Sequence, residues 1–123
     1  MAVPILKQGP FLIATIQAAL TDTDVLQLQD DVMAQVTRHR SRGIIVDVTA
    51  LDVMDSFVSR SLRSIAMMTR LRGAQTVIVG IQPEVAFAMV QLGMAFEDVL
   101  TALDLEEGLE YLQARMRDRD ARA

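Results

Sequence analysis

The residues best suited to chemistry lie together at 52–57, where Asp52, Asp55, Ser56 and Phe57 follow an apolar run. The helical pattern that begins at Ser56 indicates that this serine sits in the first turn of a helix. A hydroxyl there can accept a backbone hydrogen bond and cap the helix. It can also accept a phosphate, which adds nearly two negative charges. The sequence alone leaves both roles open.

The helix after Ser56 is predicted to have two distinct faces. One stripe is expected to pack on a sheet and consists of Val58, Leu62, Ile65, Ala66 and Thr69. The opposite stripe is expected to face solvent and consists of Ser56, Arg60, Arg63, Met67 and Arg70. Periodicity alone favours a capping hydroxyl above a solvated basic face.

A phosphate on Ser56 also has physical support. Its charge would lie at the positive end of the helix, and Arg60 lies one turn further on, where it could pair with it. Asp52 and Asp55 would oppose that charge. Because these effects partly cancel, we expect little refolding and a large change in surface charge, which would act on partner binding.

The sequence offers little support for catalysis by the chain itself. The chain has no cysteine and one histidine, His39, which lies between two arginines at a predicted helix end. A Ser-His or Cys-His pair is therefore not expected. No glycine-rich nucleotide-binding loop is present. A phosphate-accepting receiver domain would need a lysine at a strand end, but the single lysine, Lys7, lies in the entry hairpin. We expect no cofactor and no metal.

Length and charge narrow the class of protein. The chain has 123 residues, 51% of them hydrophobic, a formal net charge of −4 and a pI of about 4.8. This length suits one domain, and an acidic balance disfavours nucleic acid as a partner. No charged leader with a long apolar segment and no membrane-length stretch is seen. A cytoplasmic protein with no membrane partner is the expectation.

The pattern of elements predicts an α/β fold in the order β-β-α-β-α-β-α-β-α. Strands are expected at 3–6, 11–16, 44–48, 76–79 and 99–102, and helices at about 25–42, 56–72, 83–93 and 103–116. The alternation implies a mixed, mostly parallel sheet of four to five strands with about four helices. The domain is expected to span residues 1–117, with a frayed polar tail at 118–123.

A second loop, Gly80–Pro83, is predicted to leave its strand on the same rim as the 52–56 turn. Open α/β sheets place ligand or partner contacts there, so Gln82 and Pro83 are candidates for a partner surface. The helix that follows is nearly all apolar, and burial is the favoured interpretation.

Several segments together resemble the STAS domain of anti-sigma factor antagonists, and most closely the RsbS-type stressosome scaffold proteins. The resembling segments span about Pro4 to Gln113 and are Ile5-Leu6-Lys7, Ile45–Phe57 with its Asp55-Ser56-Phe57, Gly80–Pro83, Gln91–Gly93, and Thr101–Asp104 with Gly108-Leu109.

The resemblance implies a non-enzymatic scaffold and antagonist. Such proteins self-associate with RsbR-type co-antagonists in a large cytoplasmic assembly that holds an RsbT-type serine/threonine kinase. Under stress the kinase phosphorylates the serine of the Asp-Ser-Phe motif, here Ser56, and is released; an RsbX-type phosphatase resets it. Asp55 and Phe57 would shape the turn. Because they share the outward stripe with Ser56, Arg60 and Arg63 are assigned to the kinase- or assembly-facing surface.

Two alternatives stay open at this point. One is a monomeric anti-anti-sigma factor of the same family, which would form a small complex with a single anti-sigma kinase. The other is a domain that binds a small ligand, or acts on one, at the Gly80–Pro83 rim.

Overall fold

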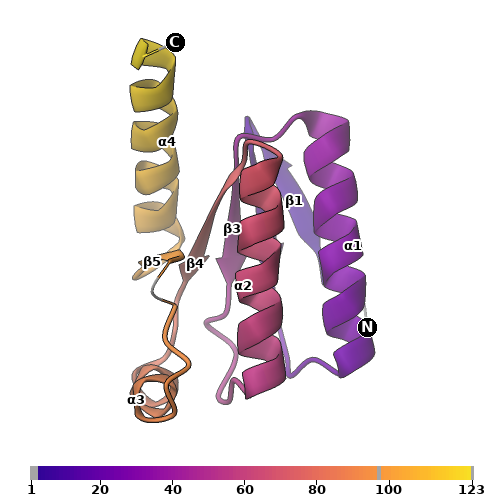
Figure 1. The fold of residues 1–123 in the computed structure, drawn as a ribbon, viewed down its shortest axis with the longest axis vertical. Coiled ribbons are helices and arrows are strands. Elements are labelled where there is room, and N and C mark those ends of the chain that lie inside the picture. The colour runs from indigo at the N-terminus through magenta and orange to yellow at the C-terminus, as the bar shows by residue number, and fades with distance from the viewer. Residues whose placement is uncertain (1–2, 97, 123) are drawn as a thin grey trace.

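The computed structural model describes residues 3–96 and 98–122 and confirms the predicted α/β fold (Figure 1). Its strands are β1 (Ile5–Gln8), β2 (Phe11–Thr15), β3 (Gly43–Asp47), β4 (Gln75–Val79) and β5 (Leu100–Ala102). Its helices are α1 (Asp22–His39), α2 (Ser56–Leu71), α3 (Pro83–Gln91) and α4 (Leu105–Arg122).

The sheet has five strands in the order β1-β2-β3-β4-β5. β1 pairs with β2 in an antiparallel hairpin, and the other neighbours are parallel. The sheet is therefore mixed and mostly parallel, as the alternation of strands and helices predicts. Because β2, β3, β4 and β5 run in the same direction, the loops that follow β3 and β4 leave the sheet at the same rim.

Helices cover both faces of the sheet. α1 and α2 lie side by side on one face, and α4 contacts β3, β4 and β5 on the other (Figure 1). β3 serves both cores: Ile44 and Val46 join the α1–α2 core, whereas Ile45 joins the α4 core. This explains the continuous β-branched run of β3, since a strand buried on both faces has no polar positions.

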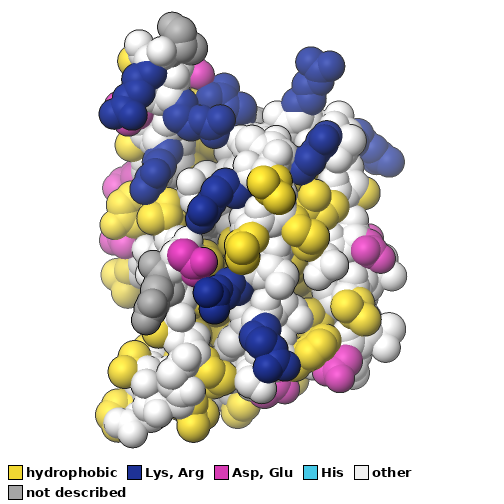
Figure 2. Space-filling model, in the orientation of Figure 1, with side chains coloured by type: hydrophobic (Ala, Val, Ile, Leu, Met, Phe, Trp, Pro, Cys, Tyr) yellow, Lys and Arg dark blue, Asp and Glu magenta, His cyan; other side chains and the backbone are white. Residues whose placement is uncertain are grey.

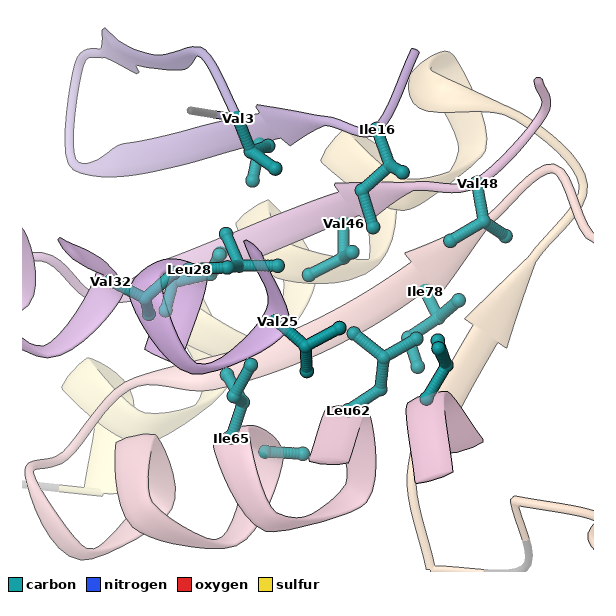
Figure 3. Packing of buried hydrophobic residues seen from close by; sticks show 14 of the residues in the cluster. Val3, Ile16, Val25, Leu28, Val32, Val46, Val48, Leu62, Ile65 and Ile78 are labelled. Carbon is teal, nitrogen blue, oxygen red and sulfur yellow. The ribbon is translucent and has the colours of Figure 1, made fainter. Parts of the chain in front are cut away.

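Buried aliphatic side chains join α1, α2 and the strands into one core. Figure 3 shows this packing, which includes Val25 and Leu28 of α1, Leu62 and Ile65 of α2, and Val46 and Ile78 of the strands. Burying each side chain of this size contributes about 1.5–3 kcal/mol. The stripe expected to pack inward is buried in full, so α2 is held firmly in register against the sheet.

α1 ends earlier than its sequence pattern suggests. The sequence predicted this helix to about residue 42, but the last helical residue is His39, and Arg40 forms a left-handed cap with φ of 49°. Gly43 is the first residue of β3. A Cβ there would lie 2.8 Å from the Leu112 side chain of α4, so close packing of the helix on the strand requires glycine.

Residues 118–122, which the sequence led us to expect as a frayed polar tail within 118–123, continue α4 to Arg122. Two long-range contacts hold this end: Arg42 pairs with Asp120 at 2.9 Å, and Arg119 donates to the carbonyl of Gly73 at 3.0 Å. Ala123 lies outside the described residues. No helix in the described ranges is both long enough and apolar enough to span a membrane.

Candidate functional site

Two loops meet at the rim where β3 and β4 end. The amide of Val48 donates to the carbonyl of Val79 at 3.0 Å, and Gln82 Nε2 donates to the carbonyl of Thr49 at 2.8 Å. Gly80 has a φ of 80°, and a Cβ there would collide with the side chain of Thr49. The 48–55 loop and the start of α3 are therefore held together, and the Gln82 side chain bridges them through its hydrogen bond to Thr49.

The helix cap is Asp55, which corrects the interpretation of Ser56 as the capping residue. The Asp55 side chain accepts a hydrogen bond from the amide of Val58 at 2.8 Å, and its backbone is extended, as a cap requires. Ser56 is the first residue inside the helix. The sequence pattern could not separate the two, because Asp and Ser cap helices about equally well.

The turn exposes Ser56 to solvent while neighbouring residues of the same turn are buried in the core. Asp52 and Ser56 are exposed, whereas Leu51 and Met54 are buried in the core. Phe57 is half-buried and packs against the same core. Asp55 thus caps the helix, and Phe57 anchors its first residues to the core. Since Asp55 forms the cap, the Ser56 hydroxyl is not needed for it.

The outward arginine stripe of α2 is present as expected. Arg60, Arg63 and Arg70 are exposed, and Figure 2 shows basic side chains over the α2 face, interrupted by hydrophobic ones. Asp98, just before β5, contacts two of them. Its carboxylate lies 3.4 Å from Arg63 Nε, and its carbonyl accepts from Arg70 at 3.0 Å. No local sequence signal could have found Asp98, because it is distant in the chain.

Two pockets flank Ser56. The larger, about 560 Å³, lies between the 52–56 turn and α3 and is lined by Asp52–Ser56 together with Glu84, Val85, Ala88, Leu92 and Met94. The smaller, about 280 Å³, lies between α2 and the segment after α3, and Ser59, Arg60 and Arg63 line it. Ser56 lines both pockets.

The other serines of α2 differ in access. Ser59 lines the same pocket as Arg60 and Arg63, but it is only 4% exposed, so a kinase would reach it poorly. Its hydroxyl oxygen has no hydrogen-bond partner among the described residues. Ser61 is half-buried and Ser64 is exposed in mid-helix. Of these serines, Ser56 alone is both exposed and located at the helix start.

α3 is less buried than its apolar sequence suggested. Only Val85 and Met89 are buried. Phe87 is 68% exposed, Val90 is 70% exposed, and Leu92, just after the helix, is 69% exposed. The helix is only nine residues long and lies past the end of the sheet, so just one side of it meets the core (Figure 1).

The described residues hold no cluster of histidine, aspartate or glutamate that could bind a metal ion. What the rim offers is an exposed hydroxyl at a positive helix end, next to arginines and an apolar helix. Such a surface can accept a charge and display it to another protein.

Comparison with known proteins agrees with this fold. The family model for the STAS domain matches residues 2–108. The RsbT co-antagonist protein RsbRA of Bacillus subtilis (strain 168) is 30% identical over 84 residues, which covers 68% of this chain and 31% of RsbRA. The chain therefore spans less than a third of the length of that relative.

Two solved structures are similar over nearly the whole chain. A serine-to-glutamate variant of RsbS from Moorella thermoacetica has a TM-score of 0.81 at 33% identity, with 94% of this chain and 97% of that chain covered. A chain from a structure of the stressosome, described as a signal integration and transduction hub, has a TM-score of 0.76 at 32% identity, with 93% and 99% covered.

Proposed function

Because the chain belongs to the STAS domain family, we propose that it is a non-enzymatic scaffold and phosphorylatable antagonist of a bacterial stressosome. In this role it assembles with copies of itself and with RsbR-type co-antagonists and holds an RsbT-type serine/threonine kinase. Phosphorylation of Ser56 under stress releases the kinase, and an RsbX-type phosphatase restores the unmodified serine.

The full-length similarity to RsbS and to a stressosome chain supports the scaffold role. The similarity to RsbRA, which is named as a co-antagonist of RsbT, supports an RsbR-type partner. The kinase and the phosphatase rest on the family resemblance carried by the Asp55-Ser56-Phe57 motif.

One observation of this structure carries the assignment of Ser56. The residue is exposed at the first position of α2, and Asp55 already caps the helix. A kinase could therefore reach the hydroxyl without unfolding the turn. In the transfer, the Oγ–P bond forms as the bond between the γ-phosphorus of ATP and its bridging oxygen breaks. ADP leaves, and the hydroxyl proton passes to a base on the kinase.

The consequence of modification is electrostatic. A phosphoserine carries about −1.5 to −2 charges at neutral pH, and the first turn of α2 has no acidic residue of its own. The helix end and Arg60 favour the charge, whereas Asp52 and Asp55 oppose it. The fold is expected to persist while the charge of the rim becomes more negative. We assign Arg60, Arg63, Gln82 and Pro83 to the surface that meets the kinase or the assembly.

The direct test is the intact mass of the chain after incubation with the cognate kinase and ATP. We expect one added phosphate, which Ser56→Ala abolishes. Ser64→Ala is the matched control, because Ser64 is an exposed serine of the same helix. A phosphate that persists in Ser56→Ala would overturn the site.

The size of the assembly tests the scaffold role separately. Mixing with an RsbR-type partner is expected to give a very large particle. A stable one-to-one complex with a kinase, and no large particle, would instead indicate a monomeric anti-anti-sigma factor. Turnover of a small molecule without any protein partner would contradict the non-enzymatic role.

A further inference from the structure

The smaller pocket beside Ser56 has the composition of a phosphate site. Its α2 wall consists of Ser56, Ser59, Arg60 and Arg63, and its opposite wall is the segment 93–96. Residues three and four apart on a helix are neighbours, with Cβ atoms about 5–6 Å apart. Ser59 and Arg60 are therefore each one turn from Ser56, and Arg63 is one turn from both of them.

Ser59 supplies an independent indication that the pocket is built for a polar ligand. The residue is 4% exposed, lines the pocket, and has a hydroxyl without a hydrogen-bond partner among the described residues. Leaving a buried hydroxyl unpaired costs about 1–3 kcal/mol. A phosphate oxygen in the pocket would accept from this hydroxyl and remove the cost.

The pocket carries both positive groups, which favour an anion, and nearby carboxylates, which oppose it. Arg60 and Arg63 carry positive charge into it, and the amino-terminal end of α2 adds a partial positive charge. The opposing carboxylates are Asp52 and Asp55 on the preceding turn and Asp98, which pairs with Arg63 at 3.4 Å. Asp98 is thus the resident anion of Arg63 before any modification.

We propose that the phosphate of Ser56, once formed as the proposed function requires, turns into this pocket and displaces Asp98 from Arg63. The phosphate accepts from the Ser59 hydroxyl and pairs with Arg60 and Arg63. A phosphate outcompetes a carboxylate for Arg63 because it carries more charge and three acceptor oxygens.

Displacement of Asp98 would change contacts at a distance from Ser56. Asp98 is held to α2 by two contacts, the Arg63 pair and the Arg70 hydrogen bond to its carbonyl. Loss of the first leaves the second as the remaining contact of Asp98 with α2 among the described residues. Asp98, which closely follows the 93–96 wall of the same pocket, therefore loosens its contact with α2 when Ser56 is modified.

The test installs phosphoserine at position 56 by genetic encoding, so it needs no kinase. Phosphorus NMR then follows the second pKa of the phosphate, which is about 6 in a free phosphoserine. In the folded chain we expect this pKa to be lowered by about 0.5–1 relative to the same chain unfolded in urea, because nearby cations favour the dianion.

Variants decide whether this pocket causes the shift. Arg63→Gln and Ser59→Ala are expected to raise the pKa of the phosphate back toward the unfolded value. Asp98→Asn is expected to lower it further, because Arg63 loses its competing partner. Arg72→Gln, an exposed arginine at the end of α2 that does not line the pocket, is the matched control. Equal pKa values in the folded and unfolded chains, or no response to Arg63→Gln, would overturn the proposal.

Amide hydrogen exchange tests the displacement of Asp98. Exchange at Met94 and Asp98 is expected to rise with phosphoserine 56, and equally in the unmodified Arg63→Gln variant. Unchanged exchange on phosphorylation would contradict the displacement. Inorganic phosphate added to the unmodified chain is a separate arm: a similar response of Ser59 and Arg63 resonances would assign the pocket to a free anion instead. A kinase that fails to modify Ser56 would sink the proposed function without altering these results.

Discussion

The two helices that frame the rim, α2 and α3, are built in opposite ways. α2 has 16 residues, a side-chain cap from Asp55 and a full buried stripe. α3 has nine residues, no side-chain cap and only two buried residues. The first is anchored along its length and carries an exposed basic face, and the second is a largely exposed apolar helix at the end of the sheet. A change of charge on one can thus be read by a partner that also contacts the other.

The largest difference between the helices should appear in stability. Leu62 of α2 is 1% exposed, so Leu62→Ala is expected to lower the free energy of unfolding by about 2–5 kcal/mol. Phe87 of α3 is 68% exposed, so Phe87→Ser should change the free energy of unfolding by no more than about 0.5 kcal/mol. Urea denaturation measures both. Similar losses would mean that α3 is packed as firmly as α2.

The rim turn can be compared with the end of α3 through two glycines. Both Gly80 and Gly93 have positive φ, but a Cβ collides with Thr49 at Gly80 and meets nothing within 4 Å at Gly93. Gly93→Ala is expected to cost about 1 kcal/mol through backbone strain alone. Gly80→Ala should cost at least about 1 kcal/mol more, because it also forces the two rim loops apart. Equal losses in thermal unfolding would contradict the locking of the loops.

Two neighbouring substitutions test which residue caps the start of α2. Asp55→Ala removes the cap and is expected to cost about 0.5–2 kcal/mol. Ser56→Ala removes a hydroxyl that the cap does not use and should stay within about 0.5 kcal/mol. Chemical denaturation of both variants is the measurement. A larger loss in Ser56→Ala than in Asp55→Ala would return the capping role to Ser56.

The smallest effect is expected for the ion pair between α2 and the segment after α3. Arg63 and Asp98 are both substantially exposed, so Arg63→Gln should cost at most about 1 kcal/mol, and less at high salt. Unfolding measured at low and high ionic strength tests this. A loss that salt leaves unchanged would show that Arg63 acts through packing instead of charge.

Local pattern predicted the fold because each element was consistent with the next. The β-branched run of β3 and the two-faced α2 left little freedom in sheet order. The misses were all tertiary. Gly43 starts β3, where it packs under Leu112 of α4, and the end of α4 is held by Arg42, which is distant in sequence. Neither contact leaves a local signal.

The arrangement of the candidate residues on α2 was predictable from the sequence, but their contacts were not. Helical phase placed Ser56, Arg60 and Arg63 on one face, and the structure confirms that placement. It could not tell the cap from its neighbour, since Asp55 and Ser56 are chemically equivalent for that purpose. Helical phase also could not show that the buried Ser59 hydroxyl lacks a hydrogen-bond partner among the described residues, or that Asp98 pairs with Arg63. Both facts depend on the residues after α3 that pack against α2.

Kinase retention by the unmodified and modified chain tests the central claim most directly. The chain with serine or with genetically encoded phosphoserine at position 56 would be assembled with an RsbR-type partner and loaded with an RsbT-type kinase. The bound kinase would then be measured after separation by size. We expect the kinase to co-migrate with the unmodified assembly and to be lost at least about tenfold more readily, or about 1.4 kcal/mol, from the phosphoserine form. Equal retention by both forms, in an intact assembly, would contradict the account.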